Sequence, residues 1–476
     1  MPFPKWLIAV FLLLLGWNLF GGGLYLTIWD WPEGSLHKYE DFARPSNAWL
    51  GRLWRWISPE LEPTPLRLLS AAWVVAGLIA WWVLARPLFG RNTTLLAGLL
   101  MGASYGLSFL AHTATEGTAL FALQLMQMLF LLRFLKQGPW HWMLAAGVCW
   151  GLSMQISQVD SFLLGLFIPL GLYVYHPEGK RYRRPFPLLL YLLSMLVFFL
   201  FFFNSRGWLA GAPPFGTWPV HSYRALLGCW PILAFVLSGL REFGHRWPRK
   251  EEFARISGIC LFAALLSLSL VAVAMLALLA AQQMKAYFAK GYPYRNLVKA
   301  AYILSVVLGF VATVFFVLLA YRLYGMEGFR AGALISLGYW VPAFIGALGL
   351  FGQRPVWLKG GVVAGFLLPA AFFWWRGTAL METVGTEDLR ALAAELPEGE
   401  RIYARQLPAS AEWYLRRQGI DIDNRYSPPS AEDETSTYLL PDSTAQAFTC
   451  RDSFRLRRGV LRMETFYRCE RPQKLD

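Results

Sequence analysis

Residues 256–284 read ISGICLFAALLSLSLVAVAMLALLAAQQM, and residues 331–353 read AGALISLGYWVPAFIGALGLFGQ, with no charged side chain in either run. A helix needs about 20 apolar residues to cross the hydrocarbon of a bilayer. Lipid offers no water to backbone N–H and C=O groups, so such runs must be helices, which pair those groups internally. The alternating segments of about ten residues that a membrane β-barrel requires are absent from the sequence. The two runs therefore predict an α-helical membrane protein.

The same pattern extends over most of the chain. The 476 residues are 56% hydrophobic and only 16% charged, whereas soluble proteins are about 25% charged. Apolar runs alternate with short polar connectors, which predicts an all-α polytopic domain of about 11–13 transmembrane helices over residues 1–380. The first run is longer than the apolar core of a signal peptide, and no small-residue cleavage site follows it, so we expect a membrane helix there. The expected segments are 5–28, 66–86, 92–110, 117–135, 140–157, 160–175, 185–203, 224–241, 255–281, 297–321, 331–352 and 357–376.

Lys and Arg are concentrated in every second connector. The basic connectors are 86–91, 133–136, 180–184 and 241–255, whereas 112–116 and 155–161 carry no Lys or Arg. The positive-inside rule then predicts a cytoplasmic N-terminus and places three long connectors outside, 29–65, 204–223 and 282–296. The net charge of +14 is explained by loops that meet anionic lipid headgroups, so nucleic acid is not an expected partner.

The number of crossings decides the side of the C-terminus. Twelve crossings would return it to the cytoplasm, whereas an odd number leaves it outside. Residues 332–352 contain several glycines and Pro342, so one hypothesis is that they form a re-entrant hairpin and do not cross. The alternative is that the chain has one more crossing than the twelve segments above. We expect an odd number and an extracytoplasmic tail.

Residues 381–476 are polar and predict a small soluble α/β domain. Cys450 and Cys469 flank two short strands expected within 453–467. A disulfide between them would close a hairpin in an oxidising compartment, and the alternative is two thiols in the cytosol. The other expected elements are strands at 401–405 and 436–440 and helices at 386–396 and 410–418.

Short motifs occur along the chain in a recognisable order. Residues 45–53 (PSNAWLGRL), 64–71 (TPLRLLSA) and 85–91 (ARPLFGR) are similar to the early part of membrane glycosyltransferases of the GT-C fold. The resemblance is to the protein mannosyltransferase-like branch, which includes the aminoarabinose transferases acting on lipid A. Residues 151–169 resemble its fifth and sixth helices, and residues 290–294 (KGYPY) resemble its Ser-Lys-x-Pro-Tyr loop.

The resemblance implies thirteen helices, a small outer C-terminal domain and a place in the bacterial inner membrane. It implies an enzyme that transfers a sugar, with inversion, from a polyprenyl phosphate to an acceptor at the outer face. It also implies a general base at the end of the first helix, a second acid in the next outer loop, and basic residues that hold the lipid phosphate.

Acidic residues of the expected outer loops supply the candidate bases, because a carboxylate can take the proton of an acceptor hydroxyl. Asp30 leads because it lies at the membrane edge, and Glu33, Glu40 and Asp41 follow in the same loop. Glu116 lies between two apolar runs, where an ionisable group is costly and usually functional. The alternatives are that the loop acids only interact with water and that Glu116 only complements a helix dipole.

Cations are needed for the phosphate that leaves. The branch has Thr-Lys-Gly where this chain has Ser157, Gln158 and Val159, so other residues must serve. The phosphate- and substrate-binding candidates are Lys38, Arg44, Asp160, Arg206, Arg224, Lys290, Tyr292, Tyr294 and Arg295. Some relatives bind a divalent ion, and His37, His112 and His221 could join Glu116 around one. Histidines in separate loops are weak evidence, so no metal ligand is assigned.

Two other functions compete with the enzyme. A transporter or flippase of lipid-linked glycans would be expected to show two similar halves with broken helices, and no such repeat is visible. A catalytically inactive scaffold of the same fold would explain the missing lysine at Gln158. The expected partners are a polyprenyl-phosphate-linked sugar, membrane lipid, and an acceptor that the residues do not identify.

Overall fold

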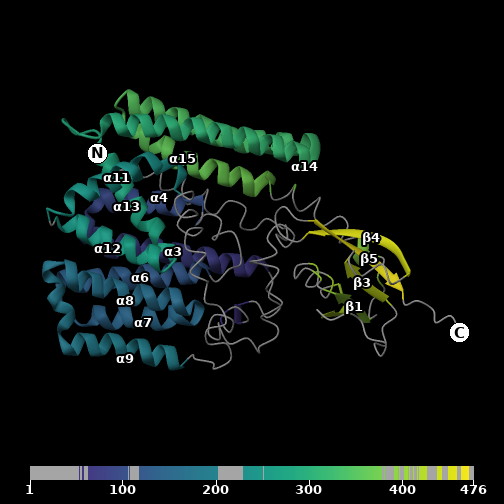
Figure 1. Ribbon diagram of the computed structural model, residues 1–476, viewed down its shortest axis with the longest axis horizontal. Coiled ribbons are helices and arrows are strands. Elements are labelled where there is room, and N and C mark those ends of the chain that lie inside the picture. Colours follow the sequence, from purple (N-terminus) through teal and green to yellow (C-terminus); the bar gives the residue numbers. More distant parts are fainter. Residues whose placement is uncertain are drawn as a thin grey trace.

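A computed structural model describes residues 63–105, 117–201, 229–249 and 251–377, the strands between 401 and 470, and short stretches or single positions elsewhere, among them a helical turn at 391–394. Its helices run side by side, and a small sheet lies beyond one end of them (Figure 1). The helices are α3 (Pro63–Phe89), α4 (Arg91–Ala103), α6 (Gly117–Gln137), α7 (His141–Ile156), α8 (Gln158–Tyr175), α9 (Pro185–Phe201), α11 (Leu233–Arg246), α12 (Glu252–Leu266), α13 (Val271–Ala286), α14 (Arg295–Phe351) and α15 (Pro355–Phe372), with shorter turns η3 (Pro177–Arg183), η5 (Trp230–Ile232) and η6 (Phe373–Gly377).

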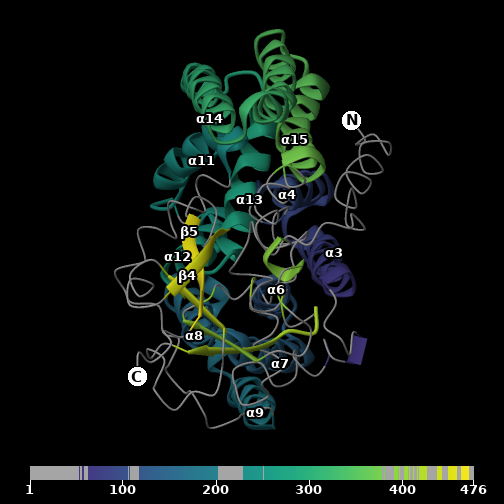
Figure 2. The ribbon, with the colours of Figure 1, turned by 90° about the vertical axis from the view of Figure 1, so that its right-hand side faces the viewer.

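Several of the predicted membrane helices are present in the described part of the chain, among them those expected at 66–86, 117–135, 160–175 and 357–376. Within the described residues, five helices are long and apolar enough to span a bilayer, and a bent pair of helices gives a sixth. Viewed from the sheet, α14 and α15 lie together at one side of the bundle and α7 and α9 at the other (Figure 2). The chain is therefore an integral membrane protein with a helical bundle, as its composition predicts.

The run 255–281, predicted as one crossing, is two helices that fold back on each other. Ala254 and Ser257 at the start of α12 line the same small pocket as Leu279 and Gln283 at the end of α13. The chain turns at Leu268, whose φ is +54°, a conformation that usually selects glycine. Because this turn contains no Gly, Pro or charge, no residue in the run marks it. The hairpin returns the chain to the end of the bundle that it left.

The helix α14 is also a hairpin, with its turn at Gly325 (φ 62°, ψ −145°). Its arms pack antiparallel, since Tyr302 Oη donates to the carbonyl of Ala343 at 3.2 Å and Trp340 Nε1 donates to Thr313 Oγ1 at 2.7 Å. The second arm, 326–351, is an unbroken helix. The re-entrant reading of 332–352 is therefore wrong, and the additional helix comes from the α12–α13 hairpin.

The C-terminal region contains a five-stranded sheet in the order β2-β1-β3-β5-β4. Strand β1 is parallel to β2 and β3, and β5 is antiparallel to β3 and β4. Cys450 and Cys469 face each other across β4 and β5 and form the disulfide that the sequence predicts. The strands are β1 (Arg401–Arg405), β2 (Asp421–Arg425), β3 (Thr437–Pro441), β4 (Thr449–Arg457) and β5 (Met463–Glu470).

Candidate functional site

Charged side chains gather at one end of the bundle, where α6, α8, α11 and α13 finish and α12, α14 and α15 begin; we call this the basic end. Lys136 pairs with Glu252, joining α6 to α12. Tyr175 of α8 packs against Trp247, with ring centroids 5.7 Å apart. Arg181 donates to the carbonyls of Leu135 and Lys136 at 2.8 and 2.9 Å, so it satisfies the last turn of α6. These contacts link several helix ends into one polar surface.

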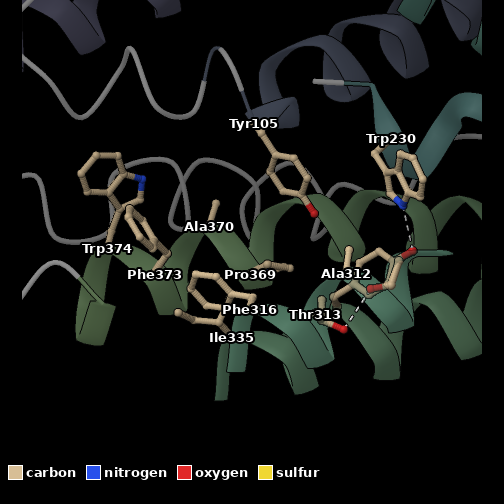
Figure 3. A pocket seen from close by; sticks show the side chains of 12 residues that line it. Tyr105, Trp230, Ala312, Thr313, Phe316, Ile335, Pro369, Ala370, Phe373 and Trp374 are labelled. Atoms are coloured by element: carbon tan, nitrogen blue, oxygen red, sulfur yellow. Dashed lines mark hydrogen bonds between the residues drawn. The ribbon is translucent and has the colours of Figure 1, made fainter. Parts of the chain in front are cut away.

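A cavity of about 570 Å³ lies toward the opposite end of the bundle, between α4, η5, α14 and α15. Figure 3 shows that its wall is largely aromatic and aliphatic. Tyr105 donates to the carbonyl of Gly365 at 3.0 Å, and Trp230 donates to Tyr339 Oη at 3.3 Å. The lining residues are Tyr105, Trp230, Gly309, Ala312, Thr313, Phe316, Ile335, Tyr339, Pro369, Ala370, Phe373 and Trp374. A cavity of this size and polarity suits an apolar ligand with few polar contacts.

Two small-residue contacts keep the walls of this cavity close together. A Cβ added at Gly309 would meet the ring of Tyr339 at 2.5 Å, so glycine lets that tyrosine pack against the first arm of α14. A Cβ added at Gly361 would meet the backbone of Gly346 at 2.4 Å, which shows how closely α15 approaches the second arm. Small residues at such crossings are common in membrane helices. The cavity is therefore framed by tightly packed helices.

Most of the predicted site residues lie outside the described residues. These are the carboxylates Asp30, Glu33, Glu40, Asp41 and Glu116, the cations Lys38, Arg44, Arg206 and Arg224, and the histidines His37, His112 and His221. Their roles stay predictions. Within the residues that are described, no group of three or more His, Cys, Asp and Glu side chains could hold a metal ion.

Asp160 lies in the first turn of α8, at the end of that helix remote from the basic end. Ser157, the residue that precedes α8, donates its hydroxyl hydrogen to Asp160 Oδ2 at 2.8 Å. A carboxylate in a first helical turn is favoured by the positive end of the helix dipole. Asp160 therefore lies toward the same end of the bundle as the cavity.

Lys290, Tyr292, Tyr294 and Arg295 lie at the basic end instead. Arg241 packs over the ring of Tyr294 at 5.7 Å, and Tyr292 Oη donates to Gln283 Oε1 at 2.5 Å. The prediction that the connectors 241–255 and 282–296 lie on opposite sides is therefore wrong. The reason is the α12–α13 hairpin, which brings both connectors to one end. These four residues cannot share a site with Asp160 and the cavity.

The contacts of Tyr292 and Arg295 are those of packing residues. Burial raises the pKa of Tyr292 to about 12, while the nearby Ser238 side chain opposes the rise and the Glu242 carboxylate adds to it. Arg295 lies over the ring of Tyr287 at 5.9 Å and donates to the carbonyl of Ala289 at 3.2 Å. Both side chains therefore hold the α13–α14 connector in place.

One buried cation was not among the predicted binding residues. The side chain of Arg67 is only 1% exposed, near the start of α3. Phe89, at the other end of α3, packs against Phe253 at the basic end, with ring centroids 5.9 Å apart, so Arg67 lies toward the cavity end. A single arginine inside an apolar run was the signal in the sequence that marks it.

Residues 44–202 match the family of dolichyl-phosphate-mannose-protein mannosyltransferases. The helical bundle and its small sheet have the GT-C fold, as the motifs predict, in an integral membrane protein.

Two crystal structures of ArnT from Cupriavidus metallidurans share this fold. The apo structure superposes with a TM-score of 0.62 at 14% identity, covering 98% of this chain and 97% of that chain. The structure bound to undecaprenyl phosphate gives 0.60 at 15% identity with the same coverage. No curated protein sequence matches the chain.

Proposed function

We propose that this protein is a glycosyltransferase that moves a sugar from a polyprenyl-phosphate donor to an acceptor at the outer face of the membrane. The observation that carries the proposal is the shared fold, over 98% of the chain, with a protein crystallised with undecaprenyl phosphate. The mannosyltransferase match over residues 44–202 and the apolar cavity support it. The cavity could hold part of an isoprenoid chain, because its wall offers mostly carbon atoms.

The proposed reaction needs a base and a positively charged phosphate site. A loop carboxylate takes the proton of the acceptor hydroxyl while the acceptor oxygen attacks the anomeric carbon of the sugar. The bond from that carbon to the phosphate oxygen breaks on the opposite face, so the configuration inverts and polyprenyl phosphate leaves. Asp30 is the leading base and Glu116 the second acid, with Glu33 and Asp41 as further candidates.

Cations stabilise the negative charge that builds on the departing phosphate. The candidates are Lys38, Arg44, Arg206 and Arg224 from the expected outer loops, and we add the buried Arg67 to them. These basic residues do not include Lys290 and Arg295, which lie at the basic end. The sugar and the acceptor are not identified by these side chains.

We place the basic end in the cytoplasm by the positive-inside rule, and the cavity end and the sheet outside. The α12–α13 hairpin adds one helix to the predicted twelve segments, which gives an odd number of crossings if each helix crosses. The disulfide between Cys450 and Cys469 supports this orientation, because disulfides persist in oxidising compartments. A bacterial inner membrane with a cytoplasmic N-terminus fits this arrangement.

The experiment that tests the proposal is a transfer assay with purified protein and a panel of polyprenyl-phosphate sugars. Asp30→Asn and Glu116→Gln should each lower kcat by at least about 100-fold, since general-base catalysis contributes that much. Glu327→Gln is the matched control, because Glu327 is an exposed carboxylate beside Gly325 that pairs with Arg330 at 2.6 Å. Transfer that survives both changes would contradict the catalytic assignment. Movement of the lipid between leaflets without sugar transfer would support a flippase instead.

A further inference from the structure

Three buried polar side chains from different elements meet inside the bundle. Gln124 of α6, Ser161 of α8 and Ser269 of the α12–α13 turn are each at most 6% exposed. Ser269 Oγ donates to Gln124 Oε1 at 2.6 Å, and Gln124 Nε2 donates to Ser161 Oγ at 3.1 Å. The carboxamide of Gln124 therefore joins the hairpin turn to the start of α8, and we call this pair of hydrogen bonds the Gln124 link.

The Gln124 link lies toward the cavity end of the bundle. Ser161 is in the first turn of α8, the turn that carries Asp160, and Gln124 is in the second turn of α6. The α12–α13 hairpin enters from the basic end with arms of 15 and 16 residues, which are about 23–24 Å long at ~1.5 Å per residue. Because the hydrocarbon of a bilayer is about 30 Å thick, the turn ends inside the bundle, where it meets the start of α8.

The backbone of the turn gives Ser269 a fixed position. Its hydroxyl accepts the N–H of Val271 at 3.2 Å, while its own N–H donates to the carbonyl of Ala264 at 2.9 Å. Ser267 in the same turn donates its hydroxyl hydrogen to that carbonyl at 3.3 Å. Away from water, each of these groups needs a protein partner. The hydroxyl hydrogen of Ser269 is left for Gln124, so the link carries the position of the turn over to α8.

The link reaches the candidate site through the first turn of α8. Ser161 follows Asp160 directly, and Ser157 on the preceding side donates its hydroxyl hydrogen to Asp160 Oδ2 at 2.8 Å. The backbone N–H of Ser161 also donates to the carbonyl of Ser157 at 3.2 Å, so these three residues form one hydrogen-bonded turn. Breaking the bond from Gln124 would leave buried polar groups without a partner, which is costly. The Gln124 link therefore holds the turn that carries the Asp160 carboxylate.

We propose that Gln124 and Ser269 are positioning residues that hold the first turn of α8, and with it Asp160, in the geometry that sugar transfer requires. This proposal rests on the proposed function and on Asp160 as a candidate substrate-binding residue of that enzyme. Neither Gln124 nor Ser269 contacts the substrate, and both act through Ser161. A displacement of about 1 Å at a reacting centre can lower the rate by about 100-fold, so a small movement of this turn is enough to lower activity.

The test is a transfer assay with the purified full-length protein and a polyprenyl-phosphate sugar. Gln124→Leu should lower kcat/KM by about tenfold, because a displaced Asp160 no longer meets the substrate in the required geometry. Gln127→Leu is the matched control, since Gln127 lies three residues further along α6, is fully buried and donates to Tyr191 Oη of α9 at 3.1 Å. It should lower Tm as Gln124→Leu does, but change kcat/KM by less than about twofold. Gln124→Glu keeps an oxygen at both positions and should remain within about threefold of the unmodified protein, because a serine hydroxyl can donate or accept.

Two further measurements separate positioning from packing. In an Asp160→Asn background, Gln124→Leu should lower kcat/KM by less than about twofold more, because a residue that acts through Asp160 has no independent effect. Hydrogen exchange of the backbone amides at 161–164 should be faster in Gln124→Leu and unchanged in Gln127→Leu. The proposal is overturned by a loss of about tenfold in the Asp160→Asn background, or by equal losses of kcat/KM in Gln124→Leu and Gln127→Leu. An unmodified protein that transfers no sugar contradicts the proposed function itself, and this proposal with it.

Discussion

The two ends of the helical bundle differ in how they use polar groups. The basic end holds its helix termini together through ion pairs and arginine contacts, such as Arg246 with Glu251 at 3.1 Å and Arg181 with the α6 carbonyls. The cavity end has an apolar pocket in which the polar atoms of Tyr105, Trp230 and Tyr339 are hydrogen-bonded to the protein itself. The first end therefore carries charged and ion-paired side chains, whereas the second surrounds an apolar cavity.

This difference shows that the function of a connector residue cannot be inferred until we know at which end of the bundle its connector lies. The KGYPY motif at 290–294 was expected at the site and lies at the basic end, whereas Asp160 lies toward the cavity end. The proposed chemistry on a lipid-linked sugar needs a place for the lipid chain, and the apolar cavity toward the other end of the bundle could provide one.

The largest expected effect is on sugar transfer, which substitutions at the two ends of the bundle should change by very different amounts. Glu116→Gln should lower kcat by at least about 100-fold, while Lys290→Gln should change it by less than about twofold, because Lys290 is exposed at the end without the cavity. The measurement is sugar transfer by purified protein under single-turnover conditions. A loss of comparable size in Lys290→Gln would show that the active site extends to the basic end.

The next largest effect is expected from removal of the disulfide, which should lower the stability of the sheet without changing that of the helices. Cys450→Ser with Cys469→Ser should lower the free energy of unfolding of the sheet by about 3 kcal/mol, because the bridge closes a loop of 19 residues. Pulse proteolysis should show earlier cleavage in the region of β1 to β5 and unchanged cleavage in the helices. If reductant leaves the proteolysis of the unmodified protein unchanged, the bridge contributes no stability.

Filling the cavity should give a smaller, specific effect. Ala370→Phe adds a ring to the pocket wall and should raise KM for a polyprenyl-phosphate sugar by about tenfold, since the added ring takes space otherwise open to the lipid. Ala300→Phe is the control, because Ala300 is exposed near the start of α14 at the basic end. Equal KM values for the two variants would place the lipid elsewhere.

The smallest effect is a pH dependence at the basic end. Burial lowers the pKa of His176. The positive charges of Lys136, Arg255 and Arg181 lower this pKa further, and the negative charge of Glu178 opposes the change. His176 Nδ1 accepts a hydrogen bond from the Glu178 N–H at 3.2 Å, which requires the unprotonated nitrogen. The folded state therefore binds fewer protons than the unfolded chain. The contribution of His176 to stability is fully present above pH 6.5 and is lost as the pH falls from that value through the lower pKa of the folded state.

His176→Asn keeps a hydrogen-bond acceptor but cannot titrate. We expect it to reduce the change in Tm between pH 7.5 and 5.5, by an amount that corresponds to less than about 1 kcal/mol. Lys136→Gln removes one of the cations that lower the pKa, so its profile should lie between the other two. Identical profiles for His176→Asn and the unmodified protein would contradict the assignment.

The apolar runs of the sequence predicted the long membrane helices correctly. They did not predict turns that lack a Gly, Pro or charged residue. Apolar runs located α3, α6, α8 and α15 because membrane length leaves a clear pattern. The α12–α13 turn was missed because Leu268 adopts a positive φ that composition does not reveal. Strand β2 was missed because only Ile422 of Asp421–Arg425 is a buried hydrophobic residue, which is too little for a strand pattern.

The types of residue in the candidate site could be predicted from the sequence, but their positions in the fold could not. The apolar cavity is formed by Tyr105, just beyond α4, and by residues of η5, α14, α15 and η6, and no short sequence motif contains them. Arg67 was visible in the sequence as a charge inside an apolar run, yet its burial depends on neighbours that the sequence alone does not specify. Residues that meet only through tertiary packing are found by structure.

The turn at Leu268 also affects how the protein is inserted into the membrane during synthesis. As the ribosome releases residues 252–286, the insertion machinery meets one apolar stretch long enough to be threaded through as a single span. If that happened, every later segment would enter the bilayer upside down, and the sheet would be delivered to a reducing compartment where Cys450 and Cys469 stay thiols. The oxidation state of this cysteine pair in cells would therefore record whether the hairpin was inserted correctly.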